Sequence, residues 1–417
     1  MQPKAGIITI GDELLIGQVI DTNSAWIAQQ LNQIGIDVIK RVAVGDNYEA
    51  IWQTIESLEK EVAIIIITGG LGPTADDITK PLLCHYFGGK MVIDKATEAH
   101  LEHIFKEVLK RPMIERNRKQ AEVPDVCTVL LNKVGTAPGM QFQKEECLYF
   151  SLPGVPHEMK WIMQNSILPM LKNKYGNYVV LHETLLTAGI GESFLAERLQ
   201  TFEANLPSNI QLAYLPNYGM VRLRLTAKGL DSNQLKESLC EQFELLKKQV
   251  NTHLVTDKDQ PLEEVVGDLL LENKATVSTA ESCTGGYIAH LLSSRPGASA
   301  YFWGSIVSYH NDVKQHNLGV DATILSTNGA VSEETVTAMA QNVRKQMGTN
   351  YSIAVSGILG PGGGTPDKPV GTVWIAAAGE QKTVAKKFNF HFDRERNKQL
   401  TTINALNLLR MLIVDNS

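Results

Sequence analysis

Two nucleophilic side chains stand next to each other in the stretch STAESCTGG at residues 278–286, where Ser282 precedes Cys283. A strand is expected to end at the serine and a helix to begin just after it, so the main-chain amides between them would point at the group under attack. Four residues supply those amides: Cys283, Thr284, Gly285 and Gly286. A helix start also favours a thiolate, so the residues alone leave the serine and the cysteine as rival nucleophiles.

A serine hydroxyl is a weak nucleophile unless a base removes its proton. The stretch SIVSYHNDVKQ at residues 305–315 offers a base, since Tyr309 should end a strand and Lys314 should follow on the next helix. A lysine held out of water is neutral and can accept the proton, with the phenol as a relay. The alternatives are a solvated surface lysine and a tyrosine packed in the core. No triad-like spacing links the histidines of this segment, which are His290, His310, His316 and His391.

Acidic residues and glycines gather in three loops near the amino terminus. GDELLIGQVIDTNS (11–24), AVGDN (43–47) and TGGLGPTADDIT (68–79) each follow an expected strand, and the carboxyl ends of parallel strands share one edge of a sheet. Glycines of the third loop would let main-chain amides approach a phosphate, namely Gly69, Gly70 and Gly72. Carboxylates beside a phosphate need a divalent cation, and we expect magnesium to be held by Asp12, Asp46, Asp76 and Asp77. The alternative is a helix cap and a tight turn.

The hydrophobic pattern divides the chain into three segments. Strand and helix patterns alternate over residues 1–169, and the run VAIIIIT (62–68) indicates a doubly buried strand, which predicts an α/β domain with a parallel sheet. Residues 170–253 mix alternating strands with two helices and predict a small α+β module with an antiparallel sheet. Residues 254–417 return to strand–helix alternation and predict a second α/β domain.

Composition limits the classes of function. The 417 residues carry a net charge of −6 and are 43% hydrophobic and 20% charged, which is typical of globular proteins. No apolar run approaches the ~18 residues of a membrane span, and the chain begins in a strand without a signal segment, so we expect a cytoplasmic protein. The five cysteines form no CxxC pair, which argues against a disulfide framework or a zinc knuckle. The acidic balance argues against direct nucleic-acid binding and favours small ligands.

The amino-terminal loops carry a family resemblance. GDELLIGQVIDTNS and TGGLGPTADDIT resemble the molybdopterin-binding fold of MoaB, MogA and MoeA proteins, and more closely the amino-terminal domain of the CinA family of competence/damage-inducible proteins. RNRKQAEVP (116–124), GTAPG (135–139) and LPGVPHEM (152–159) extend the match. The resemblance implies metal-dependent hydrolysis of ADP-ribose to AMP and ribose 5-phosphate. It implies that Asp46 and Asp77 lie nearest the ligand, with weaker candidates at Asp12, Asp76 and Glu158.

The carboxy-terminal segment closely resembles the nicotinamide mononucleotide (NMN) deamidase domain of the same family. The match runs through AESCTGG, the Tyr-x4-Lys pair, GAVS, SGILGPGGGTPDKPVGTVW and DRERN, and covers nearly all of residues 260–415. It implies that Ser282 is the nucleophile, Lys314 the base and Tyr309 the relay, with Cys283 as a small packing residue. It also implies substrate contacts at Ser299, Ser356, Gly357 and Arg396. The glycine-rich stretch 357–371 would then be a wall over the ribose phosphate, with Arg396 as the phosphate partner, rather than a linker.

The resemblance therefore implies a cytosolic enzyme of pyridine-nucleotide recycling with two hydrolytic activities. Its ligands would be NMN and ADP-ribose, its assembly a homodimer, and only the amino-terminal site would need a metal. Two alternatives remain. The amino-terminal domain could be a pterin- or nucleotide-binding relative without pyrophosphatase activity, or the protein could be an interaction factor in competence or the DNA-damage response. The middle module carries no chemistry that the residues identify, and we expect a role in packing or dimerisation.

Overall fold

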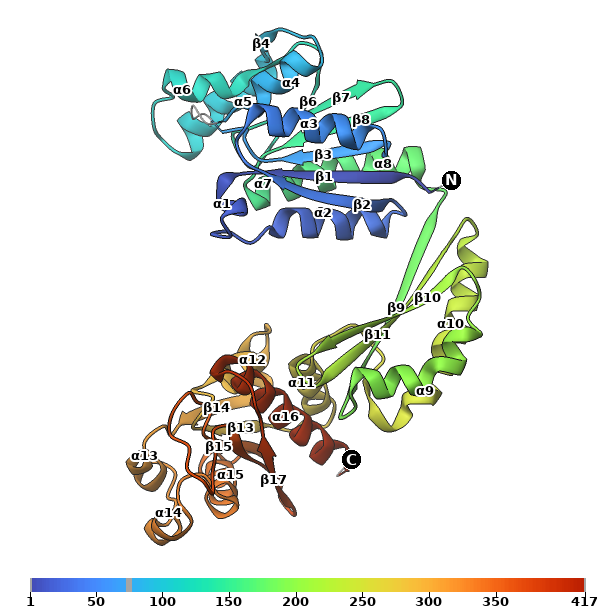
Figure 1. Ribbon diagram of the computed structural model, residues 1–417. Coiled ribbons are helices and arrows are strands. Elements are labelled where there is room, and N and C mark those ends of the chain that lie inside the picture. Colours follow the sequence, from blue (N-terminus) through green and yellow to red (C-terminus); the bar gives the residue numbers. More distant parts are fainter. Residues whose placement is uncertain (1, 73–76, 416–417) are drawn as a thin grey trace. The chain divides into compact units, whose positions relative to one another are not determined.

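The computed structural model describes residues 2–72 and 77–415. The chain divides into two compact units, which Figure 1 shows in the colours of the sequence. The first unit comprises the residues up to Leu181 together with Ala227–Glu237, and the second comprises His182–Thr226 and the residues from Ser238 onward. The predicted α/β fold class is confirmed, because a mostly parallel sheet, a small α+β module and a second mixed sheet follow one another along the chain. None of the described helices is long and apolar enough to cross a membrane.

A six-stranded sheet forms the centre of the first unit, in the order β2-β1-β3-β8-β7-β6. Neighbours among the first four strands run parallel, whereas β7 and β6 are antiparallel. All residues of β3 are buried, in agreement with the isoleucine run that predicts a strand covered on both faces. The strands are β1 (Lys4–Ile10), β2 (Asp37–Val44), β3 (Ile64–Thr68), β6 (Thr128–Leu130), β7 (Gly139–Lys144) and β8 (Cys147–Leu152).

Helices cover both faces of this sheet because each carries an apolar stripe at helical spacing. Ile27 and Leu31 of α2 pack on one face with residues of α7 and α8. Ile51 and Ile55 of α3 pack on the other face with residues of α4. The helices are α1 (Asp12–Leu15), α2 (Thr22–Gln33), α3 (Tyr48–Glu59), α4 (Thr79–Tyr86), α5 (Lys95–His103), α6 (Glu115–Arg118), α7 (Pro156–Ile162) and α8 (Leu168–Tyr175), and a separate pair of strands is β4 (Met91–Ile93) with β5 (Glu122–Pro124).

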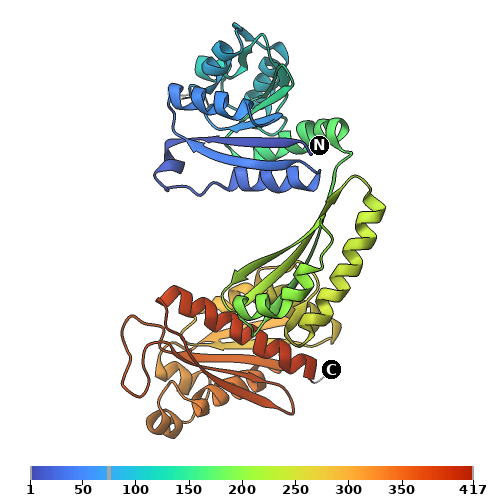
Figure 2. The same ribbon diagram turned by 45° about the vertical axis from the view of Figure 1, so that its right-hand side comes forward.

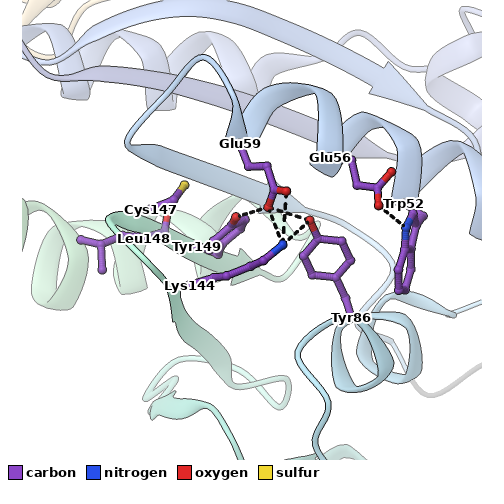
Figure 3. Close-up of polar contacts among 8 residues, drawn as sticks. All are labelled: Trp52, Glu56, Glu59, Tyr86, Lys144, Cys147, Leu148 and Tyr149. Carbon is purple, nitrogen blue, oxygen red and sulfur yellow. Dashed lines mark hydrogen bonds and ion pairs between the residues drawn. The ribbon is translucent and has the colours of Figure 1, made fainter.

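The carboxylate of Glu59, at the end of α3, joins three parts of the first unit (Figure 3). It accepts hydrogen bonds from the hydroxyls of Tyr86 and Tyr149, each at 2.7 Å, and from the Lys144 amine at 3.0 Å. Burial alone would raise the pKa of Glu59, but the hydrogen bonds from the two tyrosines and the lysine outweigh burial and lower the pKa. Glu59 therefore ties α3 to α4 and to the β7–β8 hairpin.

The middle module runs in the order β9-α9-β10-β11-α10-β12, and its sheet has the strand order β10-β11-β9-β12. This succession is the ferredoxin-like split βαβ arrangement. The last strand lies just after the predicted border at 253/254, and the predicted border at 169/170 falls inside α8. The elements are β9 (Val179–Ala188), α9 (Glu192–Ala204), β10 (Ile210–Asn217), β11 (Met220–Gly229), α10 (Ser232–Val250) and β12 (Leu254–Thr256).

The last sheet has five strands in the order β14-β13-β15-β16-β17. The first three run parallel and the last two are antiparallel. Leu270 of α11, Ile288 of α12 and Leu409 of α16 pack in one cluster, and α15 packs in another around Val336 and Met339. Figure 2 shows α16 lying along the sheet. The strands are β13 (Val277–Glu281), β14 (Phe302–Val307), β15 (Tyr351–Gly357), β16 (Thr372–Ala378) and β17 (Thr383–Asn389), and the helices are α11 (Leu262–Glu272), α12 (Tyr287–Ser293), α13 (Asn311–His316), α14 (Ala322–Asn328), α15 (Glu333–Met347) and α16 (Arg394–Asp415).

Replacing Glu59 by glutamine should lower the free energy of unfolding by about 2 kcal/mol at neutral pH, because hydrogen bonds to a charged group are lost. The folded-state pKa lies below the ordinary 4.5, so the stabilisation is complete above that value and disappears as the pH falls through the folded pKa. Denaturant unfolding of the whole chain should therefore show a smaller difference from wild type at about pH 4 than at neutral pH. Glu61→Gln, which breaks an exposed ion pair with Lys40, is the control and should cost less than about 1 kcal/mol. An equal loss for Glu59→Gln at both pH values would contradict the assignment.

Candidate active site

A cavity of about 270 Å³ lies where β13 and β15 end. Ser282 follows β13 directly, Ser356 and Gly357 end β15, Lys314 comes from α13, and Arg394 begins α16. The carboxyl ends of parallel strands leave space for a ligand at this edge of a sheet. The fold thus gathers at one edge polar side chains that are far apart in the sequence.

Ser282 and Lys314 are in direct contact inside this cavity. The Lys314 amine lies 3.1 Å from the Ser282 hydroxyl oxygen, and the two residues are only 1% and 8% exposed, in that order. The other partners of the amine in the described chain are the main-chain oxygens of Ser308 at 2.7 Å and Tyr309 at 3.5 Å. Burial lowers the pKa of Lys314, so its amine gives up a proton more readily than that of an exposed lysine.

Tyr309 lies at the cavity with its phenol against Arg394. Its side chain lines the cavity but is 60% exposed, and its hydroxyl accepts a hydrogen bond from the Arg394 guanidinium at 2.8 Å. Because the Lys314 amine already touches the Ser282 hydroxyl, a phenol between them is not needed. The relay role of Tyr309 therefore stays a prediction, and the contact that the structure shows for its phenol is the one with Arg394.

Cys283 is buried beside the nucleophile and belongs to the hydrophobic core of this sheet. Burial, with a further contribution from the charge of Glu281, raises the pKa of the Cys283 thiol to about 12. A thiol with so high a pKa stays protonated at neutral pH and is a poor nucleophile. The environment therefore favours Ser282 in the choice that the sequence leaves open.

The turn after Ser282 uses part of its amides internally. The amide of Gly285 donates to the main-chain oxygen of Ser282 at 3.1 Å, and the amide of Gly286 donates to the Glu281 carboxylate at 3.1 Å. The expectation that four consecutive amides face the substrate is thus wrong for these two glycines, and the amides of Cys283 and Thr284 remain as candidates. Gly286 has a φ of 98°, a left-handed conformation that favours glycine.

The DRERN motif places Arg394, not Arg396, at the cavity. Arg394 lines it and donates to the main-chain oxygen of Gly360 at 2.8 Å, whereas the Arg396 guanidinium lies 3.8 Å from the centre of the Phe392 ring. Ser299, which is exposed in a short 3-10 helix at residues 298–300, is not among the cavity residues either. Sequence reasoning therefore missed Arg394, although the motif contains both arginines.

The glycine-rich stretch is held at both ends and forms part of the cavity wall. The Gly371 amide donates to the Ile358 oxygen at 2.6 Å, and the Lys368 amine donates to a main-chain oxygen at 2.7 Å. Ser356 is buried and donates to the Ala330 oxygen at 2.6 Å. A side chain at Gly357 would meet the neighbouring strand β16, with a Cβ only 2.7 Å from a Val373 methyl group. The stretch therefore has the contacts of a fixed wall and not of a linker.

Asn397, which the sequence reasoning did not single out, fixes this wall to α16. It is completely buried, and its side-chain amide donates to the main-chain oxygens of Leu359 at 3.1 Å and Phe392 at 2.8 Å. A polar residue one turn into a predicted helix, beside a glycine-rich loop, is the signal that sequence reasoning could have used.

In the first unit, Asp12 and Asp46 face each other across the ends of β1 and β2. Each carboxylate accepts a hydrogen bond from the main-chain amide of the other residue, at 3.2 and 3.3 Å. Asp77 instead accepts from the Gly72 amide at 2.8 Å, and Asp76 lies outside the described residues. Within residues 2–72 and 77–415, no group of three or more His, Cys, Asp or Glu side chains is arranged to hold a metal ion.

The glycines of loop 68–79 are not all free to bind a phosphate. The amide of Gly69 donates to the main-chain oxygen of Leu152 at 3.1 Å, and Gly72 is engaged by Asp77 as described. Gly70 packs against Thr79, where an added Cβ would lie 2.1 Å from the threonine hydroxyl. The expected cradle of three glycine amides is therefore corrected for Gly69 and Gly72.

Comparison with known proteins identifies all three segments. Residues 6–173 match a probable molybdopterin binding domain, residues 182–255 the damage-inducible protein CinA KH domain, and residues 259–413 the CinA C-terminal domain. A crystal structure of the competence/damage inducible protein CihA from Agrobacterium tumefaciens is 34% identical and covers 39% of this chain and 100% of its own, with a TM-score of 0.35.

Two full-length relatives are each named CinA-like protein. The one from Cytophaga hutchinsonii is 46% identical over 97% of both chains, and the one from Flavobacterium psychrophilum is 46% identical over 99% of both chains. With this identity over its whole length, the chain belongs to the CinA family.

Proposed function

We propose that the carboxy-terminal domain hydrolyses the amide of NMN, giving nicotinate mononucleotide and ammonia. The contact between the Ser282 hydroxyl and the buried Lys314 amine carries this proposal, because such a pair can generate a serine nucleophile without a histidine. The resemblance of the surrounding motifs to the NMN deamidase domain supports the choice of substrate.

The reaction begins when the neutral Lys314 amine takes the proton of Ser282 and the serine oxygen attacks the carboxamide carbon. The oxygen of the tetrahedral intermediate faces the amides of Cys283 and Thr284. The C–N bond breaks as Lys314 returns the proton to the leaving nitrogen, which departs as ammonia. Water, again deprotonated by Lys314, then hydrolyses the acyl-enzyme and restores the serine. No metal takes part in this sequence of steps.

Ammonia release from NMN should be lost in Ser282→Ala and in Lys314→Arg, by about 10⁴-fold in kcat, because a guanidinium cannot act as the base at neutral pH. Cys283→Ala should keep most of the activity, since its thiol only packs beside the turn. These three variants and the wild type form one assay series. Activity that survives Ser282→Ala and disappears in Cys283→Ala would show that the cysteine is the nucleophile.

We assign the phosphate of NMN to Arg394, whose guanidinium lines the cavity and is oriented by Gly360 and Tyr309. Arg394→Gln should raise the KM for NMN about tenfold or more, because charge-assisted hydrogen bonds to the phosphate are lost. Arg396→Gln is the matched control and should leave KM near the wild-type value. For nicotinamide riboside, which lacks the phosphate, Arg394→Gln and the wild type should have the same KM. An equal loss with both substrates would exclude phosphate recognition by this arginine.

For the amino-terminal domain we propose metal-dependent hydrolysis of ADP-ribose to AMP and ribose 5-phosphate. The observation that favours it is the facing pair Asp12 and Asp46, with Asp77 on the neighbouring loop. Magnesium is commonly held by one or two protein carboxylates together with substrate phosphates, and this pair fits that requirement. A bound ion would neutralise the diphosphate and supply hydroxide near neutral pH.

AMP release from ADP-ribose should stop when a chelator is added and should fall about 100-fold or more in Asp46→Asn. Glu49→Gln, an exposed acid in the first turn of α3, is the control and should behave as wild type. Activity that persists both with the chelator and in Asp46→Asn would refute the metal site. Tight molybdopterin binding without AMP release would instead favour the pterin-binding alternative.

We propose no direct nucleic-acid ligand for the middle module. KH domains clamp the nucleic-acid backbone with a Gly-x-x-Gly loop, and residues 182–255 contain no such sequence. The negative net charge of the whole chain, −6, also opposes binding to phosphate chains.

A further inference from the structure

The side chain of Glu281 is completely buried directly in front of the proposed nucleophile. Its carboxylate accepts hydrogen bonds from the amides of Gly286 at 3.1 Å, Ile288 at 3.0 Å and Ala289 at 2.8 Å. The hydroxyl of Thr284 donates to the same carboxylate at 2.7 Å. The steps proposed above leave this network without a part in the reaction.

Glu281 also reaches the base through its main chain. Its carbonyl oxygen accepts a hydrogen bond from the Ser308 amide at 2.7 Å, and the Ser308 oxygen accepts one from the Lys314 amine at 2.7 Å. Ser282 is the next residue in the sequence. A displacement of residue 281 would therefore move both the hydroxyl and the amine that must exchange a proton.

The partners of the Glu281 side chain require a carboxylate. The three amides and the Thr284 hydroxyl donate to it, the Thr279 hydroxyl lies 3.3 Å from the same carboxylate, and an ionised carboxylate is a group that only accepts. The first turn of α12 adds a favourable dipole. A glutamine would have the same shape, but it would turn an amino group toward one of these donors and carry no charge.

We propose that Glu281 is a positioning residue of the deamidase site. It keeps in place the turn at Ser282 and the main chain at Ser308, which contacts the Lys314 amine. This role rests on the proposed function of Ser282. Glu281 is not among the residues that line the cavity, so it acts through its neighbours and not on the substrate. A misplacement of reacting groups by about 1 Å can cost about 100-fold in rate.

A fluorophosphonate probe, which reacts covalently with an activated serine, separates this role from a purely structural one. The end point of labelling reports the folded fraction, and the rate constant reports the reactivity of Ser282. We expect Glu281→Gln to lower the rate constant about 100-fold with an unchanged end point, and to lower kcat for NMN with little change in KM. Glu334→Gln, an exposed acid in the first turn of α15, is the control and should label as wild type.

If Glu281→Gln does not fold, Thr284→Val and Thr284→Ser decide the question, because they remove or keep a single hydroxyl bond to the carboxylate. The valine variant should label more slowly and the serine variant should restore the rate. A lowered end point with a wild-type rate constant would overturn the proposal, as would equal rates in the two Thr284 variants. Probe labelling that follows this pattern without NMN turnover would support the positioning role of Glu281 and refute only the assignment of NMN as the substrate. A wild-type chain that takes no label at Ser282 would overturn both the nucleophile and this role.

Discussion

The chemistry proposed for the carboxy-terminal domain depends on an amine that is buried without a counter-charge in the part of the chain that the structure describes. Lys314 is 1% exposed, and its partners in the described chain are the Ser282 hydroxyl and two main-chain oxygens. An ammonium ion in such a place loses its hydration without gaining a carboxylate, which destabilises the charged form. In the proposed reaction, the burial that lowers the pKa of Lys314 is also what suits it as a base for the serine.

The buried Glu281 is connected to the Lys314 amine through the main chain of Ser308, but its carboxylate does not pair with that amine. The Glu281 carboxylate accepts hydrogen bonds from the Thr279 and Thr284 hydroxyls and from amides at Gly286 and in the first turn of α12. The two groups thus have separate partners, because the Glu281 carboxylate accepts from neighbouring hydroxyls and amides and the Lys314 amine contacts Ser282 and two main-chain oxygens.

Local patterns predict the elements, and tertiary contacts decide the details of the site. The isoleucine run of β3 and the alternating strands of the middle module could be recognised from the sequence, because their burial follows directly from residue type. The sequence could not show that Arg394 and not Arg396 reaches the cavity, since the first turn of α16 sets that choice. Likewise no local signal reveals that the Tyr309 phenol binds Arg394, or that the Gly69 amide extends the sheet toward Leu152.

The most direct test of this account is the titration of the Lys314 amine in the whole chain, followed by NMR of ε-labelled lysine with Lys314→Met to assign the signal. We predict that Lys314 loses its proton below the ordinary lysine value of 10.5, and that the rate of Ser282 acylation rises with the same midpoint. An amine that titrates at or above the ordinary value, while acylation of the serine proceeds at neutral pH, would contradict it.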